Sequence, residues 1–181
     1  TATIMFGHVE ASLHWARHLL VLRDLQAETG GFTEFVPLPF VHMEAPMYLR
    51  GQARRGPSFR EAVLMHSIAR LALHPHFTNI QTSWVKMGPA GAALALQAGA
   101  NDLGGTLMNE SISRAAGTQH GQEFPPEAME ALILSIGRHP MQRTTSYGAV
   151  APEREAASRA APELAPVIQT APRKKMLLAG D

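Results

Sequence analysis

The stretch TATIMFGH, residues 1–8, is an apolar run that ends in a glycine and a histidine. Its residues alternate too little for a strand with one wet face, and the strands of parallel sheets are buried on both faces. Three similar runs follow, and they end in polar clusters at residues 34–42, 81–84 and 101–106. Because functional side chains collect at the carboxyl ends of parallel strands in (β/α) barrels, this pattern favours such a barrel.

Segments with helical periodicity separate the four runs. Ser58 and Glu61 have the spacing of a capping box at the start of one helix, and Gly30 follows the last residue of another. Helices are predicted over residues 12–29, 58–73, 89–98 and 125–136. Strands and helices alternate, which predicts an α/β fold with a parallel sheet built from four βα units.

The size of the chain limits how much of a barrel it can form. Pro37 and Pro39 cannot donate ladder hydrogen bonds, so we expect the second strand to end near Val36. Four units occupy residues 1–150, whereas a complete barrel takes about 250 residues. This predicts a partial barrel, and an open doubly wound sheet is the alternative. Residues 151–181 lack apolar periodicity and are predicted to be a disordered tail.

The composition excludes several classes of function. The 181 residues include no cysteine, which rules out disulfides, thiolate metal sites and iron–sulfur ligation from within this chain. A net charge of +1 gives no field that would favour nucleic acid or an anionic membrane. No apolar run approaches the ~20 residues of a membrane span, so we expect a cytoplasmic protein. The sequence opens in a strand without a methionine, so we expect upstream residues to be missing.

The first two runs contribute candidate site residues. His8 follows a strand, where an imidazole can move a proton, bind a metal or orient a substrate, although it could equally be a hydrogen-bonded loop residue. Glu34 lies inside an apolar run, where a carboxylate must be paired or bind something unless it points outward. His8, Glu34, His42 and Asp102 could also hold zinc or manganese in a barrel hydrolase, which is a less favoured alternative.

The later runs add amide, hydroxyl and carboxylate groups. Gln81 and Ser83 suit a flat ligand with several hydrogen-bonding groups, although Gln81 could instead satisfy the backbone. Two glycines beside Asp102 allow the backbone to approach a ligand, although a tight turn would also explain them. The predicted binding residues are His8, Glu34, Gln81, Ser83, Asn101, Asp102, Gly104, Gly105, Glu110, Arg143 and Tyr147. The last two could close the barrel mouth over a ligand, or they could equally belong to a plain carboxyl-terminal extension.

Several long motifs carry a family resemblance. They are FTEFVPLPF at residues 32–40, NIQTSWVK at 79–86, GANDLGGTL at 99–107 and QRTTSYG at 142–148. In this order they resemble the radical SAM enzymes of deazaflavin and menaquinone biosynthesis. Within that group they resemble the tyrosine-using 4-hydroxyphenyl transferases of the FO synthase family.

The resemblance implies a radical SAM barrel in which S-adenosyl-L-methionine and a [4Fe-4S] cluster generate a 5′-deoxyadenosyl radical. It implies transfer of the 4-hydroxybenzyl group of L-tyrosine to 5-amino-6-(D-ribitylamino)uracil. The family holds its cluster with a Cys-x3-Cys-x2-Cys loop in the amino-terminal half of the barrel. Because this chain has no cysteine, it resembles the carboxyl-terminal half, which would contribute to the cavity for substrates and S-adenosylmethionine.

Three functional hypotheses follow from these observations. The first is a fragment of an FO-forming enzyme, inactive alone, whose missing amino-terminal half is supplied in cis or in trans. The second is a free-standing half-barrel that binds the pyrimidine or a deazaflavin, or complements a split enzyme. The third is the metal-dependent hydrolase, which ranks lowest because its candidate ligands include no close His-x-His pair.

Overall fold

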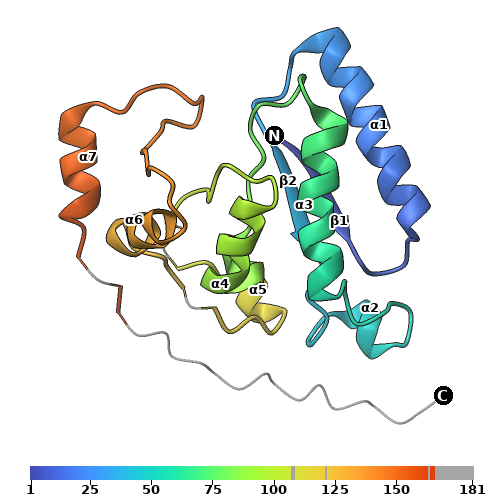
Figure 1. The fold of residues 1–181 in the computed structure, drawn as a ribbon. Helices are drawn as coiled ribbons and strands as arrows, with labels where there is room; N and C mark the ends of the chain where they lie inside the picture. Colours follow the sequence, from blue (N-terminus) through green and yellow to red (C-terminus); the bar gives the residue numbers. More distant parts are fainter. Residues whose placement is uncertain (107–108, 121, 163, 166–181) are drawn as a thin grey trace.

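A computed structural model describes residues 1–106, 109–120, 122–162, 164 and 165 of the chain (Figure 1). Its sheet contains two strands, β1 (Ala2–Phe6) and β2 (Phe35–Pro39). They are parallel, with Ala2 opposite Phe35 and Phe6 opposite Pro39. Helix α1 (Ser12–Thr29) connects them, because parallel neighbours need a crossover rather than a tight turn.

The third and fourth apolar runs join this sheet through single parallel bridges. Phe35 bridges Ile80, and Gln81 bridges Asp102. Four segments therefore lie side by side in the order of the sequence. Sequential order is that of a barrel wall, whereas a doubly wound sheet changes direction at a switch point. The fold is thus α/β with a small parallel sheet, consistent with a partial barrel.

Among the residues that the structure describes, four complete βα units do not form, because the last two predicted strands are too short. The third run enters a helix at Trp84, two residues after its ladder contacts end. The fourth run turns at Gly104, whose φ of +74° lies in the left-handed region. A strand needs several consecutive extended residues, and neither run keeps them.

Pro37 and Pro39 lie inside β2, so the prediction that this strand ends near Val36 is wrong. Phe40 donates its N–H to β1, whereas Phe35 bonds to the third run through its N–H and its C=O. Successive residues of a strand bond to opposite neighbours. Both prolines therefore face the third run, where pairing has already ended, and β2 loses no ladder bond by containing them.

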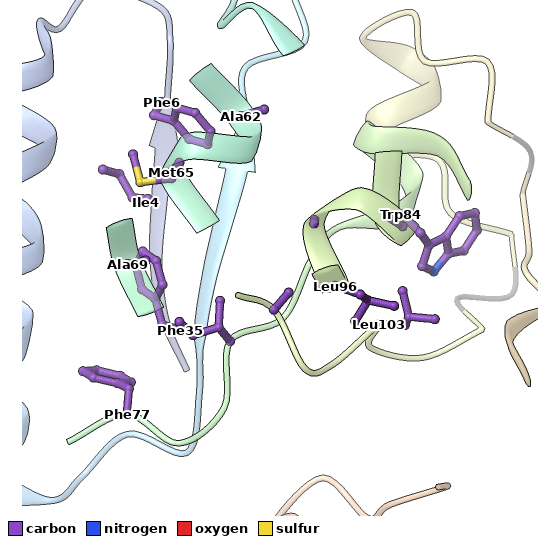
Figure 2. Close-up of a cluster of buried hydrophobic side chains, with 14 of the residues drawn as sticks. Ile4, Phe6, Phe35, Ala62, Met65, Ala69, Phe77, Trp84, Leu96 and Leu103 are labelled. Atoms are coloured by element: carbon purple, nitrogen blue, oxygen red, sulfur yellow. The ribbon is translucent and has the colours of Figure 1, made fainter. Parts of the chain in front are cut away.

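Two helices cover one face of the strands, α1 and α3 (Phe59–Leu73) (Figure 1). Gly30 ends α1 with a φ of +58°. The predicted capping box starts α3, since Glu61 N–H donates to Ser58 Oγ at 3.2 Å and Ser58 N–H donates to the Glu61 carboxylate at 2.6 Å. Figure 2 shows the core that these elements enclose. Phe6, Phe35 and Phe77 are almost fully buried in it, and each such side chain contributes about 1.5–3 kcal/mol.

The described part of the chain has five further helices, of which α4 and α6 also contribute buried side chains to this core. They are α2 (Pro46–Leu49), α4 (Trp84–Gln97), α5 (Ile112–Ala115), α6 (Pro126–Ser135) and α7 (Pro152–Arg159). A break at Gly88, with a φ of +68°, divides α4, so the predicted helix from Pro89 is its second part. None of the helices in the described part of the chain is long and apolar enough to cross a membrane.

Helix α7 lies in the segment that the sequence predicted to be disordered. That prediction is wrong for residues 152–159, because charge pairing stabilises a helix there without an apolar stripe. Arg159 lies 2.6 Å from a carboxylate oxygen of Glu130 and 3.2 Å from one of Glu155. Residues 166–181 of the predicted tail lie outside the described residues.

One face of the strands lies opposite α1 and α3, and we call it the open face. Residues of β1 alternate between buried and exposed, and Met5 is 53% exposed although it lies within the strand. The buried set packs against α1 and α3, so Thr3 and Met5 mark the open face. In a closed barrel, the face opposite the helices is the interior.

Candidate functional site

Polar side chains gather at both ends of the strands rather than at one. At the amino ends, four side chains form what we call the amino-end cluster: Glu34, Asp102, Arg143 and Tyr147. At the carboxyl ends, helices α2 and α5 border a cavity of about 330 Å³, which we call the carboxyl-end cavity. β1 has five residues, so the two ends are about 16 Å apart.

Arg143 and Tyr147 tie the chain after α6 to the strands. Arg143 Nε donates to Asp102 Oδ2 at 2.5 Å, and its Nη2 lies 3.4 Å from Glu34 Oε2. The Tyr147 hydroxyl lies 2.5 Å from Glu34 Oε2 and 2.6 Å from Asp102 Oδ2. The guanidinium carbon stands 4.0 Å above the centre of the Tyr147 ring, which adds a cation–π contact.

Burial strengthens these contacts. The side chains of Asp102, Glu34 and Arg143 are 6%, 13% and 24% exposed. Burial, together with hydrogen bonds to both carboxylates, raises the pKa of Tyr147 well above its usual value, so the phenol stays protonated and can donate. Burial lowers the pKa of Arg143, but the hydrogen bond and charge of Asp102 outweigh it and raise that pKa overall. The four side chains satisfy one another.

The placement of this cluster bears on a question that the sequence left open. Arg143 and Tyr147 could close the mouth of the barrel or belong to a plain carboxyl-terminal extension, and in the structure they lie at the amino ends of the strands. Glu34 is there because β2 begins at Phe35, so Glu34 precedes the strand instead of lying within it. Contact of these residues with a ligand stays a prediction.

Glu10 organises the loop after β1. Its carboxylate accepts from the N–H groups of Gly7, His8 and Val9, the last two at 3.2 and 3.0 Å. Trp15 Nε1 donates to it at 2.6 Å, and His8 Nδ1 lies 2.9 Å away. Burial raises the pKa of Glu10, but these hydrogen bonds outweigh it and lower that pKa from 4.5 to about 2. His8 is therefore held at the carboxyl end of β1, as predicted, by a carboxylate that the sequence analysis did not select.

Glu10→Gln tests this network through its pH dependence. Because folding lowers the pKa of Glu10, its contribution to stability is complete above about pH 4.5 and is lost as the pH falls towards about 2. We expect Glu10→Gln to be less stable than the unchanged chain near pH 7 and to lose less stability over that acidic range. Urea unfolding at a series of pH values measures this. The exposed Glu28→Gln is the control, and equal pH profiles for Glu10→Gln and the unchanged chain would contradict the assignment.

The carboxyl-end cavity lies on the open face, since Met5 forms part of its wall. Lys86, at the start of α4, also lines it, and its Nζ donates to the buried Ser113 Oγ at 3.2 Å. Burial lowers the pKa of Lys86, and the nearby charge of Glu110 opposes that shift. Glu110 starts α5 by accepting from the Ser113 N–H at 2.9 and 3.1 Å. Glu110, one of the predicted binding residues, thus contacts the lining of this cavity.

The remaining predicted residues mostly hold the backbone in place. Asn101 Oδ1 accepts from the Ile80 N–H and from Arg70, both at 2.8 Å. Gly104 donates its N–H to Asp102 Oδ1 at 2.6 Å, and Gly105 C=O accepts from Trp84 Nε1 at 3.0 Å. These contacts support a structural role for three of the candidates.

Gln81 and Ser83 surround the same turn. A Cβ on Gly104 would meet Gln81 Nε2 at 2.6 Å, so the glycine makes room for this amide. Ser83 is buried and precedes α4 without a side-chain cap. Gln81 shares the open face with Asp102, because the two residues are bridge partners.

The structure does not assemble the proposed metal site. His8 contacts Glu10 at the carboxyl end of β1, whereas Glu34 and Asp102 belong to the amino-end cluster. Within the described ranges, no group of three or more His, Asp or Glu side chains could hold a metal ion. The chain has no cysteine, so its residues do not fit a [4Fe-4S] cluster, and we assign no step to one.

Sequence reasoning missed Glu10 and Lys86. Lys86 directly follows the apolar pair Trp84–Val85. A charge beside a buried run is costly unless it has a partner, so this position indicates a candidate binding residue. Glu10 could have been found from its position two residues after the strand-end histidine.

The chain matches known proteins over most of its length. A family model described as "CofH/MqnC C-terminal region" matches residues 29–155. FO synthase of Mycobacterium tuberculosis H37Rv is 53% identical over 151 residues, which are 83% of this chain and 18% of that protein. FO synthase of Streptomyces coelicolor is 51% identical over 172 residues, which are 93% of this chain and 20% of that protein.

A shorter relative covers the same region. The 5-amino-6-(D-ribitylamino)uracil–L-tyrosine 4-hydroxyphenyl transferase of Methanopyrus kandleri is 52% identical over 147 residues, 81% of this chain and 40% of that protein. The chain thus spans less than half the length of each of these relatives. Since the family model covers more than half of its residues, the chain belongs to the CofH/MqnC C-terminal region family.

Proposed function

We propose that this chain is the carboxyl-terminal half of a radical SAM barrel that makes the FO precursor. In this reaction the 4-hydroxybenzyl group of L-tyrosine is joined to 5-amino-6-(D-ribitylamino)uracil. The observation that carries the proposal is the sequential parallel order of the four segments, together with a family match over residues 29–155. The order suits one wall of a barrel, and the printed name of the Methanopyrus relative supplies the two substrates.

The open face supports a role as one part of a larger barrel. Met5 is exposed on it, although it lies within β1. In the part of the chain that the structure describes, β1 and the fourth run each pair on one side only, so both are unpaired edges. Unpaired edges favour association with further strands. The amino-terminal half of the barrel would cover this face, in cis or in trans.

The chain's own part in the reaction is to bind and orient substrates. S-adenosyl-L-methionine and a [4Fe-4S] cluster would supply the radical chemistry, and the thiolates for that cluster must come from outside these residues. The carboxyl-end cavity offers an apolar wall and a few polar groups, as small-molecule sites commonly do. We therefore place substrate contact at the carboxyl ends of the strands.

A chimera tests the proposal. The 147 matching residues of the Methanopyrus kandleri transferase are replaced by those of this chain, and product is measured from L-tyrosine and 5-amino-6-(D-ribitylamino)uracil. We expect the adduct to form. A chimera that folds, carries iron and cleaves S-adenosylmethionine to 5′-deoxyadenosine, yet forms no adduct, would rule the proposal out.

A further inference from the structure

The carboxyl-end cavity combines an apolar wall with two opposite charges. Met5, Phe40, Pro46 and Ile112 are among its apolar lining residues. Lys86 and Glu44 supply its charged groups. A volume of about 330 Å³ lies at the lower end of the range for small-molecule sites, so the cavity suits one compact ligand rather than a nucleoside conjugate.

The Lys86 ammonium has more hydrogen-bond donors than the structure gives it acceptors, so it can bind an anion. Its ammonium has three donors, and the structure gives it one acceptor, Ser113 Oγ at 3.2 Å. No carboxylate among the described residues lies within the 4.0 Å of an ion pair with Nζ. The nearby charge of Glu110 opposes the effect of burial on the pKa of Lys86 but does not outweigh it. A half-buried charge without an ion pair is costly, and a bound anion would offset that cost.

The geometry points to a specific ligand class. We propose that Lys86 binds the α-carboxylate of an aromatic amino acid whose ring lies against the apolar wall of the carboxyl-end cavity. Glu44, on the same lining, is available to the α-ammonium group. This rests on the proposed function, in which that amino acid is L-tyrosine.

A carboxylate suits this site better than a phosphate. Phosphate sites usually gather several donors, such as a bidentate arginine or a series of backbone N–H groups. The cavity lining contributes one lysine and no arginine. One ammonium and one hydroxyl suit the two oxygens of a carboxylate, and the neighbouring carboxylate of Glu44 would repel a doubly charged group.

The lysine content of the chain allows a direct measurement. The sequence has three lysines, Lys86, Lys174 and Lys175, so K174R with K175R leaves Lys86 as the sole lysine. In that background, [ε-13C]lysine labelling gives one NMR signal. We expect L-tyrosine to shift this signal, and tyramine, which has the same ring and amine but no carboxylate, to leave it in place.

Calorimetry with variants completes the test. For Lys86→Met we expect the affinity for L-tyrosine to fall at least about tenfold, while the affinity for tyramine is unchanged. Arg55→Met, which removes an exposed cation, is the matched control and should bind L-tyrosine normally. Lys86→Arg keeps the charge and should retain part of the affinity if the methionine variant fails to fold.

Three outcomes would overturn the inference. They are absence of L-tyrosine binding, equal affinities of the unchanged chain and Lys86→Met, or a Lys86 signal that moves with S-adenosylmethionine but not with L-tyrosine. The chimera separates this result from the proposed function. If the chimera forms product but tyrosine binding does not depend on Lys86, only the inference about Lys86 is wrong. If tyrosine binding depends on Lys86 but the chimera forms no product, only the proposed function is wrong.

Discussion

Arg143→Met is expected to lower the free energy of unfolding by about 3 kcal/mol. The substitution keeps much of the side-chain volume but leaves Glu34 and Asp102 close together without their cation, and both carboxylates are largely buried. It also removes the tether between the strands and the segment after α6. Urea unfolding followed by circular dichroism measures the change.

Two conservative variants define the origin of that loss. Tyr147→Phe removes only a hydroxyl that contacts the same two carboxylates, so we expect a loss of about 1–2 kcal/mol. Arg143→Lys keeps the charge but not the forked geometry, and should fall between the unchanged chain and Arg143→Met. If Arg143→Met costs less than Tyr147→Phe, the guanidinium does not hold the cluster together.

Gly7→Ala should destabilise the fold by about 2–4 kcal/mol, because it combines strain with a clash. Gly7 has a φ of +92°, and a Cβ there would lie 2.2 Å from Pro57 Cδ and 2.4 Å from Pro57 N. The proline ring and backbone cannot move aside as a flexible side chain could. The substitution would also distort the loop directly after β1, which carries His8 and Glu10.

Gly51→Ala is the matched control for this prediction. Gly51 also has a positive φ, +71°, but a Cβ there would meet no atom within 4 Å. It should therefore show the conformational cost alone, about 1 kcal/mol. Both variants are compared by urea unfolding, and similar losses would show that the approach to Pro57 is not tight in solution.

Local signals predicted the helices well. Ser58 with Glu61, and Gly30, mark helix ends through contacts between residues close in sequence, and the structure has both. The start and end of a strand depend on its neighbours instead. β2 runs through two prolines because the segment beside them has already left the sheet, which no local pattern could indicate.

The candidate site was predicted less well for a related reason. Glu34 and Arg143 are 109 positions apart, and their contact follows from how the whole chain folds. The apolar run begins at Phe32, whereas β2 begins at Phe35. Glu34 therefore lies at the amino-end edge of the sheet and not within the strand. The polar residues of the runs therefore lie at both the amino and the carboxyl ends of the strands, although the sequence predicted that all of them lie at the carboxyl ends. The parallel order of the runs was accessible from the strand–helix alternation alone.

The two prolines of β2 also limit where an additional β-strand can pair with the sheet. Beyond Phe35, the side of β2 that faces the third run presents ring carbons at Pro37 and Pro39 where donors would otherwise stand. An additional β-strand cannot form a full set of hydrogen bonds with this side of β2. The space between β2 and the third run therefore resists cross-β aggregation. Additional strands would therefore pair beside β1 or beside the run that contains Asp102, which are the two margins where the proposed barrel would close.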